Sequence, residues 1–216
     1  MTITTPTEPP TANPRGHLYV VAAPSGTGKT SLVKALMAQR PSLAFSVSHT
    51  TRPRRLNEVD GRDYHFTDPD TFRRMIAAGD FLEHARVFDN LYGTGRAGVE
   101  QALARGQDLL LEIDWQGAAQ VRAHLPEALD IFILPPSRAA LEARLRGRGT
   151  DSEAVIARRL LDSVTELSHW AEFRYAIVND HFEQALAGLG RIVAGDGEAF
   201  DASRPGLAEF ASGLLA

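Results

Sequence analysis

The chain has 216 residues, enough for one compact domain with a small inserted lobe. Its 23 basic and 27 acidic side chains give a formal charge of −4, which argues against a nucleic-acid partner held by bulk charge. The chain contains no cysteine, which excludes disulfides and thiolate metal sites, and its apolar runs are too short to span a membrane. We therefore expect a cytoplasmic enzyme with no nucleic-acid or membrane partner.

The beginning of the chain combines a polar tail with a nucleotide-binding pattern. Residues 1–16 are rich in Thr and Pro and have no apolar core, so we expect a disordered tail rather than a secretion signal. Residues 18–23 form an apolar, β-branched run typical of a buried parallel strand. After a Gly-rich turn, residues 31–40 have apolar side chains at helical spacing, and Pro41 ends that helix. A strand, a glycine turn and a helix in this order open an α/β nucleotide-binding fold.

The composition changes between residues 46 and 94, where Arg, Asp, Gly and aromatic residues gather. This segment predicts a small inserted lobe of short strands with one helix at 69–78. Strands are then expected at 109–113, 129–134 and 175–178, and helices at 98–105, 117–124, 137–145 with Ser137 as N-cap, 151–173, 182–193 and, more weakly, 207–215. The alternation predicts an α/β fold with a parallel-sheet core, helices on both of its faces and a small inserted lobe.

The strongest motif is the segment Ala23-Pro-Ser-Gly-Thr-Gly-Lys-Thr30, a phosphate loop in which Ala23 replaces the usual first Gly. Gly26 and Gly28 let backbone N–H groups surround a phosphate without obstruction by a Cβ atom. Lys29 can reach the β- and γ-phosphates, and the Thr30 hydroxyl can bind Mg²⁺. The alternative is an ordinary glycine turn with a solvated lysine, which the flanking strand and helix make less favoured. The motif predicts binding of a nucleoside triphosphate.

The inserted lobe has the composition of a second phosphate site. Residues 46–55 contain three arginines within four positions, a pattern that most often marks a solvated face. Acidic and aromatic residues follow them, namely Glu58, Asp60, Asp63, Tyr64, Phe66 and Tyr92. Arginine forks for phosphate, tyrosine hydroxyls and an aromatic wall together suit a phosphorylated planar base.

The chain resembles the guanylate kinase family of bacterial type over roughly residues 18–193. The strings that match, in the family's order, are Ala23-Pro-Ser-Gly-Thr-Gly-Lys29, Ser46-Val-Ser-His-Thr-Thr-Arg52, Gly61-Arg-Asp-Tyr64, Phe81-Leu-Glu83, Tyr92-Gly-Thr94, Ile113-Asp-Trp-Gln-Gly117, Arg146-Gly-Arg-Gly149 and Ile177-Val-Asn-Asp180. The resemblance implies a P-loop nucleoside monophosphate kinase that transfers the γ-phosphate of ATP to GMP, with Mg²⁺ bound along with ATP. Acceptance of dGMP, and a monomer or a homo-oligomer, stay open.

The resemblance also divides the chain. It implies a kinase domain at 17–195, and the disordered tail expected at 1–16 and a C-terminal extension at 196–216 fall outside the resemblance. Within the domain, the core would comprise residues 17–45 and 97–195, the GMP-binding lobe residues 46–96 and a short lid about residues 146–160.

On the acceptor side, the resemblance implies that Arg52, Arg55, Tyr64 and Tyr92 hold the GMP phosphate. Whether Arg54 or Arg55 contacts it stays open, because the loop from Arg52 to Glu58 lacks the family's usual Pro-Gly. The implied readers of the guanine are Ser48, Glu83 and Thr94, with Asp114 approaching the GMP or the metal. One carboxylate can accept both guanine N1–H and the 2-amino group, so Glu83 would reject adenine by about 10⁴-fold. Glu112 lies on the same side of its strand as Asp114, where the family usually has Asp.

On the donor side, the expected ATP-binding residues are Ala23, Pro24, Ser25, Gly26, Thr27, Gly28, Lys29, Thr30, Ser31 and Asn179, the last one near the adenine. Thr30 is the expected protein ligand of Mg²⁺. Lys29, Arg52 and the lid arginines Arg148 and Arg159 are the expected catalytic residues, acting by alignment and charge neutralisation. The acceptor is an anionic phosphate oxygen, so we expect no general base.

Other classes of protein compete with this interpretation. A kinase for AMP, UMP or a nucleoside is disfavoured by Glu83 together with Ser48 and Thr94. A non-catalytic module that binds phosphopeptides is disfavoured by the intact Lys29 and Thr30. A GTPase switch is disfavoured because the sequence has no base-specificity motif for GTP.

Overall fold

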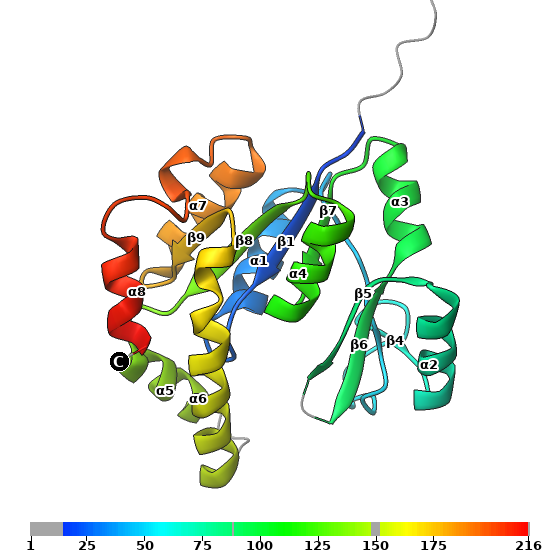
Figure 1. The fold of residues 1–216 in the computed structure, drawn as a ribbon, viewed down its shortest axis with the longest axis horizontal. Coiled ribbons are helices and arrows are strands. Elements are labelled where there is room, and N and C mark those ends of the chain that lie inside the picture. The colour runs from blue at the N-terminus through cyan, green and yellow to red at the C-terminus, as the bar shows by residue number, and fades with distance from the viewer. Residues whose placement is uncertain (1–14, 88, 148–151, 216) are drawn as a thin grey trace, which may run out of the picture.

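The computed structural model describes residues 15–87, 89–147 and 152–215. Its core is a parallel five-stranded sheet with the strand order β2-β7-β1-β8-β9. These strands are β1 Leu18–Ala22, β2 Ala44–Phe45, β7 Leu109–Glu112, β8 Leu129–Leu134 and β9 Tyr175–Val178. β1 lies at the centre of this order, so the loop that follows it lies at the carboxyl ends of the strands, in the middle of the sheet (Figure 1).

Helices cover both faces of this sheet, because alternate residues of each central strand enter two different apolar clusters. In β8, Phe132 and Leu134 belong to one cluster, and Ile131 and Ile133 belong to the other. The first cluster is completed by α3 Arg96–Ala104, α4 Trp115–His124, the end of α6 Glu153–Ser168 and α8 Leu207–Leu215. The second is completed by α1 Lys29–Gln39 and α7 Phe182–Val193.

The inserted lobe is a separate four-stranded sheet with the order β4-β3-β6-β5. Its strands are β3 His49–Thr50, β4 His65–Phe66, β5 Phe81–Val87 and β6 Asn90–Gly95, and α2 Pro69–Ala78 packs on β5. Asp68 caps α2 through its side chain, and Gly79 ends that helix with a φ of 75°. In Figure 1 the lobe lies beside the lower end of the core, opposite α5 Arg138–Arg146 and α6.

The predicted fold class is confirmed, and several element bounds need correction. The predicted helix at 151–173 is too long, because α6 runs over Glu153–Ser168 and a short 3-10 helix at Trp170–Glu172 follows it. The ring of His169 stacks on Trp115 with 3.5 Å between centroids, and His169 Nδ1 lies 2.5 Å from Glu172. These contacts of the turn at His169 fix the chain where α6 ends. The two-residue strand β2 and the 3-10 helix Glu198–Phe200 were not predicted.

The C-terminal helix at 207–215 is confirmed and contributes buried side chains to the core. The predicted tail falls on residues 1–16, of which 1–14 lie outside the described residues. In the part of the chain that the structure describes, no helix is long and apolar enough to cross a membrane.

Candidate active site

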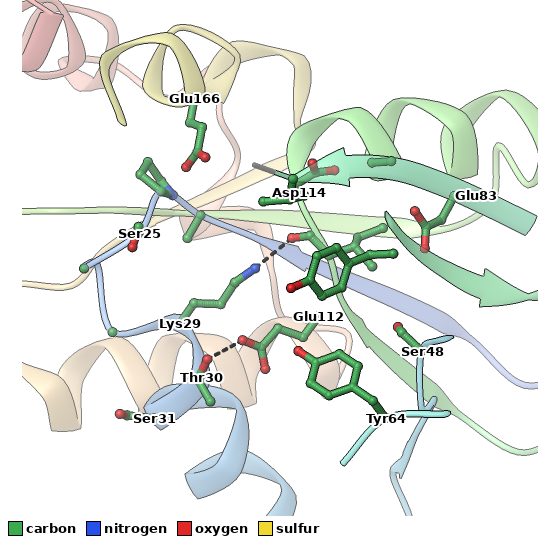
Figure 2. A pocket seen from close by; sticks show the side chains of 18 residues that line it. Ser25, Lys29, Thr30, Ser31, Ser48, Tyr64, Glu83, Glu112, Asp114 and Glu166 are labelled. Carbon is green, nitrogen blue, oxygen red and sulfur yellow. Dashed lines mark hydrogen bonds between the residues drawn. The ribbon is translucent and has the colours of Figure 1, made fainter. Parts of the chain in front are cut away.

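A pocket of about 330 Å³ lies at the carboxyl ends of β1 and β7, between the core and the inserted lobe. In open α/β sheets, ligands bind in the crevice at the carboxyl ends of the strands. Figure 2 shows Lys29 and Thr30 on one side of the pocket and Ser48, Tyr64 and Glu83 on the other. The predicted residues that line it are Ala23, Pro24, Ser25, Gly26, Gly28, Lys29, Thr30, Ser31, Ser48, Tyr64, Glu83, Tyr92 and Asp114. The structure therefore brings the two predicted sites together in one cavity.

The phosphate loop joins β1 to α1 and has the conformation that its glycines predict. Gly26 and Gly28 have φ values of 90° and 91°, in the left-handed region that L side chains rarely adopt. Gly28 is also the N-cap of α1, so the positive end of the helix dipole faces the pocket. Lys29 Nζ donates a 2.8 Å hydrogen bond to the carbonyl of Ile113, and the Thr30 hydroxyl donates to Glu112. The loop thus presents backbone N–H groups, an ammonium group and a hydroxyl to the same space.

A buried side chain supports the phosphate loop from behind. Asn179 is 4% exposed and its Nδ2 donates to the carbonyl of Thr27 at 2.7 Å. Arg144 donates to the carbonyl of Asn179 at 2.9 Å and to that of Thr27 at 3.3 Å. Thr27 is itself buried, and its hydroxyl bonds to the carbonyl of Pro24 at 2.8 Å. Asn179 therefore contacts the phosphate loop from behind, at Thr27, and neither residue is part of the pocket lining in the described chain.

Glu83 lies on the opposite wall and is only 3% exposed. Its Oε1 accepts a 2.6 Å hydrogen bond from the hydroxyl of Thr94, which is paired with Glu83 across β5 and β6. The hydroxyl of Ser48 lies 3.5 Å from that of Thr94. Burial raises the pKa of Glu83 to about 7, and the negative charge of Asp114 adds to the rise, while the Thr94 hydrogen bond opposes it. The three predicted guanine readers thus form one hydrogen-bonded group.

The predicted phosphate cage is only partly assembled around the pocket. Tyr64 and Tyr92 line it with ring centroids 6.0 Å apart, and the Arg52 guanidinium lies 5.3 Å from the Tyr64 ring. Arg52 is paired with Glu58 at 2.7 Å, next to this aromatic pair. Arg55 is exposed, and its backbone N–H donates to Glu58 at 2.8 Å. Arg52 and Arg55 lie outside the pocket lining in the described part of the chain.

Comparisons with known proteins identify the family. A family model for guanylate kinase matches residues 15–195. The chain belongs to the guanylate kinase family. It is 57% identical over 188 residues to a guanylate kinase from Chromohalobacter salexigens, covering 87% of this chain and 86% of the relative. It is 54% identical over 200 residues to one from Alkalilimnicola ehrlichii, covering 93% and 98% of the two chains. A crystal structure of guanylate kinase from Anaplasma phagocytophilum superposes with a TM-score of 0.71 at 31% identity, covering 86% and 88%.

The two predicted lid arginines are Arg148 and Arg159. Arg148 lies outside the described residues. Arg159 belongs to α6 and is half-buried, away from the pocket lining of the described chain. Arg146 forms ion pairs with Glu142 at 2.9 Å and with Glu153 at 2.5 Å, which tie the end of α5 to the start of α6.

Several residues of this guanylate kinase pocket were not predicted. Glu166 reaches it from α6, on the side of Ser25 (Figure 2), and burial raises the pKa of its carboxyl to about 7. The ammonium group of Lys29 opposes that rise. Ala85, Val87 and Ile113 add apolar surface. The sequence gives only a weak signal for Glu166, an acidic residue beside the apolar Leu167 in the predicted helix at 151–173.

Proposed function

We propose that this chain transfers the γ-phosphate of ATP to GMP and releases ADP and GDP. The observation that supports this most directly is the shared pocket, which has the phosphate loop on one wall and the buried Glu83 carboxyl on the other. A phosphate donor and a guanine acceptor bound to these walls would face each other. The relatives of this chain are themselves named guanylate kinases.

On the donor side, residues 23–31 would form the ATP site, in which the backbone N–H groups that follow Pro24 would bind the ATP phosphates and Lys29 would neutralise charge at the β- and γ-phosphates. The hydroxyl of Thr30 and the carboxylate of Glu112, which are hydrogen-bonded to each other, are the hard oxygen ligands that suit Mg²⁺. No cluster of three or more acidic, His or Cys ligands occurs in the described residues. We infer that a metal here is shared with the nucleotide phosphates, for which Mg²⁺ would supply charge neutralisation.

On the acceptor side, Glu83 would accept hydrogen bonds from guanine N1–H and the 2-amino group, with Ser48 and Thr94 beside it. Tyr64 and Tyr92 would contact the GMP phosphate through their hydroxyls. Arg52 lies directly behind Tyr64, and we propose that the loop 52–63 moves it and Arg55 onto the phosphate when GMP binds. In this proposal residues 46–96 form the GMP-binding lobe, and residues about 146–160 form the lid with Arg148 and Arg159.

The reaction requires little covalent chemistry from the protein. A GMP phosphate oxygen forms a bond to the γ-phosphorus, and the bond from that phosphorus to the β-phosphate oxygen breaks, so that ADP leaves. Lys29 and the arginines would offset the charge that spreads over the transferring group. Because the acceptor oxygen is already anionic near neutral pH, none of these residues needs to remove a proton.

The first test compares monophosphates as acceptors in an assay that couples ADP release to a spectroscopic signal. We expect GMP to exceed AMP and UMP by several orders of magnitude in kcat/KM. Glu83→Gln places an amide donor against guanine N1–H, so kcat/KM for GMP should fall by about 100-fold or more. Glu100→Gln, an exposed glutamate on α3, is the matched control and should behave as wild type. If Glu83→Gln kept the full GMP preference, Glu83 would not be the residue that reads the base.

A further inference from the structure

A glycine in α4 lies directly against the carboxyl group of Glu83. Gly117 is in the first turn of α4, and its N–H donates to the cap residue Asp114 at 2.8 Å. A Cβ atom at this position would lie 2.5 Å from Oε2 of Glu83 and 3.1 Å from its Cδ. Gly117 is absent from the glycines of positive φ among the described residues, so the helix itself does not require glycine there. The closest contact is with the Glu83 carboxyl group, since the next neighbour, Cδ1 of Ile113, would lie at 3.2 Å.

The neighbouring contacts prevent Glu83 from moving away from the helix. Gln120 lies one turn after Gly117, and its side chain bonds to both backbone groups of His84, at 3.1 Å to the N–H and 2.8 Å to the carbonyl. These two bonds fix the backbone of β5 against α4 beside Glu83. The other carboxyl oxygen, Oε1, is held by Thr94 at 2.6 Å. A methyl group at position 117 would therefore displace the carboxyl group rather than the strand.

We propose that Gly117 is a positioning residue for guanine selection. Because it has no side chain, it leaves the space in which the Glu83 carboxyl lies between α4 and Thr94, oriented toward the pocket. This inference rests on the role of Glu83 proposed above and extends it to a residue that touches no nucleotide. An added methyl group would push Oε2 toward the space of the base or break the Thr94 bond, and either change would weaken guanine binding.

The decisive variant is Gly117→Ala, because alanine adds only the one atom in question and is a better helix former than glycine. We expect KM for GMP to rise about tenfold or more, in keeping with the cost of a displaced recognition group. KM for ATP should stay within about twofold of wild type, and the variant should remain folded. Gly98→Ala is the matched control, since a Cβ at that helical position in α3 meets no atom within 4 Å. It should leave both KM values unchanged.

A second variant, combined with the first, tests the contact itself. Glu83→Asp shortens the side chain by one methylene and so moves the carboxyl group away from position 117. The loss of GMP affinity that Glu83→Asp causes should therefore be smaller in the Gly117→Ala background than in the wild-type background. Full additivity, an unchanged KM for GMP in Gly117→Ala, or equal rises in both KM values would overturn the inference. The Glu83→Gln panel separates the two proposals. If that variant loses GMP selection while Gly117→Ala keeps it, only the role of Gly117 fails; if Glu83→Gln keeps selection, the role of Glu83 fails first.

Discussion

At the scale of single residues, the protonation state of Glu83 is the feature with the clearest consequence. A buried carboxyl is harder to ionise than one in water, and burial raises the pKa of Glu83 to about 7. A carboxylate can accept two hydrogen bonds side by side, whereas the protonated group has a donor in place of one acceptor. The ionised form is therefore the one suited to guanine. It dominates above the raised pKa and is lost below it.

We accordingly predict that KM for GMP rises as the pH falls from about 8 to about 6, by about tenfold if the Glu83 charge alone controls binding. Steady-state kinetics across this range would measure the rise. Glu83→Gln serves as the reference because its profile contains only the other titrations, including that of the GMP phosphate. The pKa of Glu166 is also raised to about 7, and its effect should appear in KM for ATP. Parallel GMP profiles for wild type and Glu83→Gln would contradict the prediction.

At the scale of elements, sequence signals predicted helices well where local chemistry sets their ends. The predicted helix at 69–78 is confirmed at both ends, because Asp68 and Pro69 begin it and Gly79 ends it. The end of α6 was missed because the turn at His169 is fixed by a ring stack on Trp115, a contact between distant parts of the sequence. The strand β2 was missed because two residues paired with β7 carry no periodicity.

The same distinction holds for the candidate site. The conformation of the phosphate loop could be predicted from the sequence, since it depends on glycines within the loop itself. The grouping of Ser48, Glu83 and Thr94 came from the family resemblance, because separate segments of the inserted lobe supply them and no local pattern connects them. Glu166 and the support of Thr27 by Asn179 could not be predicted from residue spacing. Both depend on how helices and strands far apart in the chain pack around the loop.

We predict from that packing that Asn179 maintains the shape of the phosphate loop. Asn179→Ala removes the 2.7 Å bond to the Thr27 carbonyl, so kcat/KM for ATP should fall about tenfold while KM for GMP is unchanged. The neighbouring, exposed Asp180→Asn is the control. Replacing ATP by other nucleoside triphosphates as donors distinguishes loop support from an adenine contact. Loop support predicts the same loss for every base, whereas a loss confined to ATP would support the adenine contact expected from the sequence.

At the scale of the whole molecule, the core extends beyond the part of the chain that defines the family. The family model ends at residue 195, yet α8 packs against α6 and contributes Leu207, Ala211 and Leu214 to the larger apolar cluster. This cluster includes Leu167, the neighbour of Glu166 in the sequence. The C-terminal segment is therefore joined physically to the helix that closes one side of the pocket, and we expect it to stabilise the domain.

Leu207→Ala tests this contribution, because Leu207 is 4% exposed and its loss leaves a cavity in the larger apolar cluster. The free energy of unfolding should fall by roughly 2–4 kcal/mol, the usual cost for a buried leucine. Urea denaturation would measure it, with Leu161→Ala as the control, since that leucine on α6 is 73% exposed and should change stability by less than about 0.5 kcal/mol. Equal effects of the two substitutions would mean that α8 is dispensable to the core. A large loss confined to Leu207→Ala, with kcat retained at temperatures where that variant is folded, would place the C-terminal helix in the folding unit rather than in the catalytic machinery.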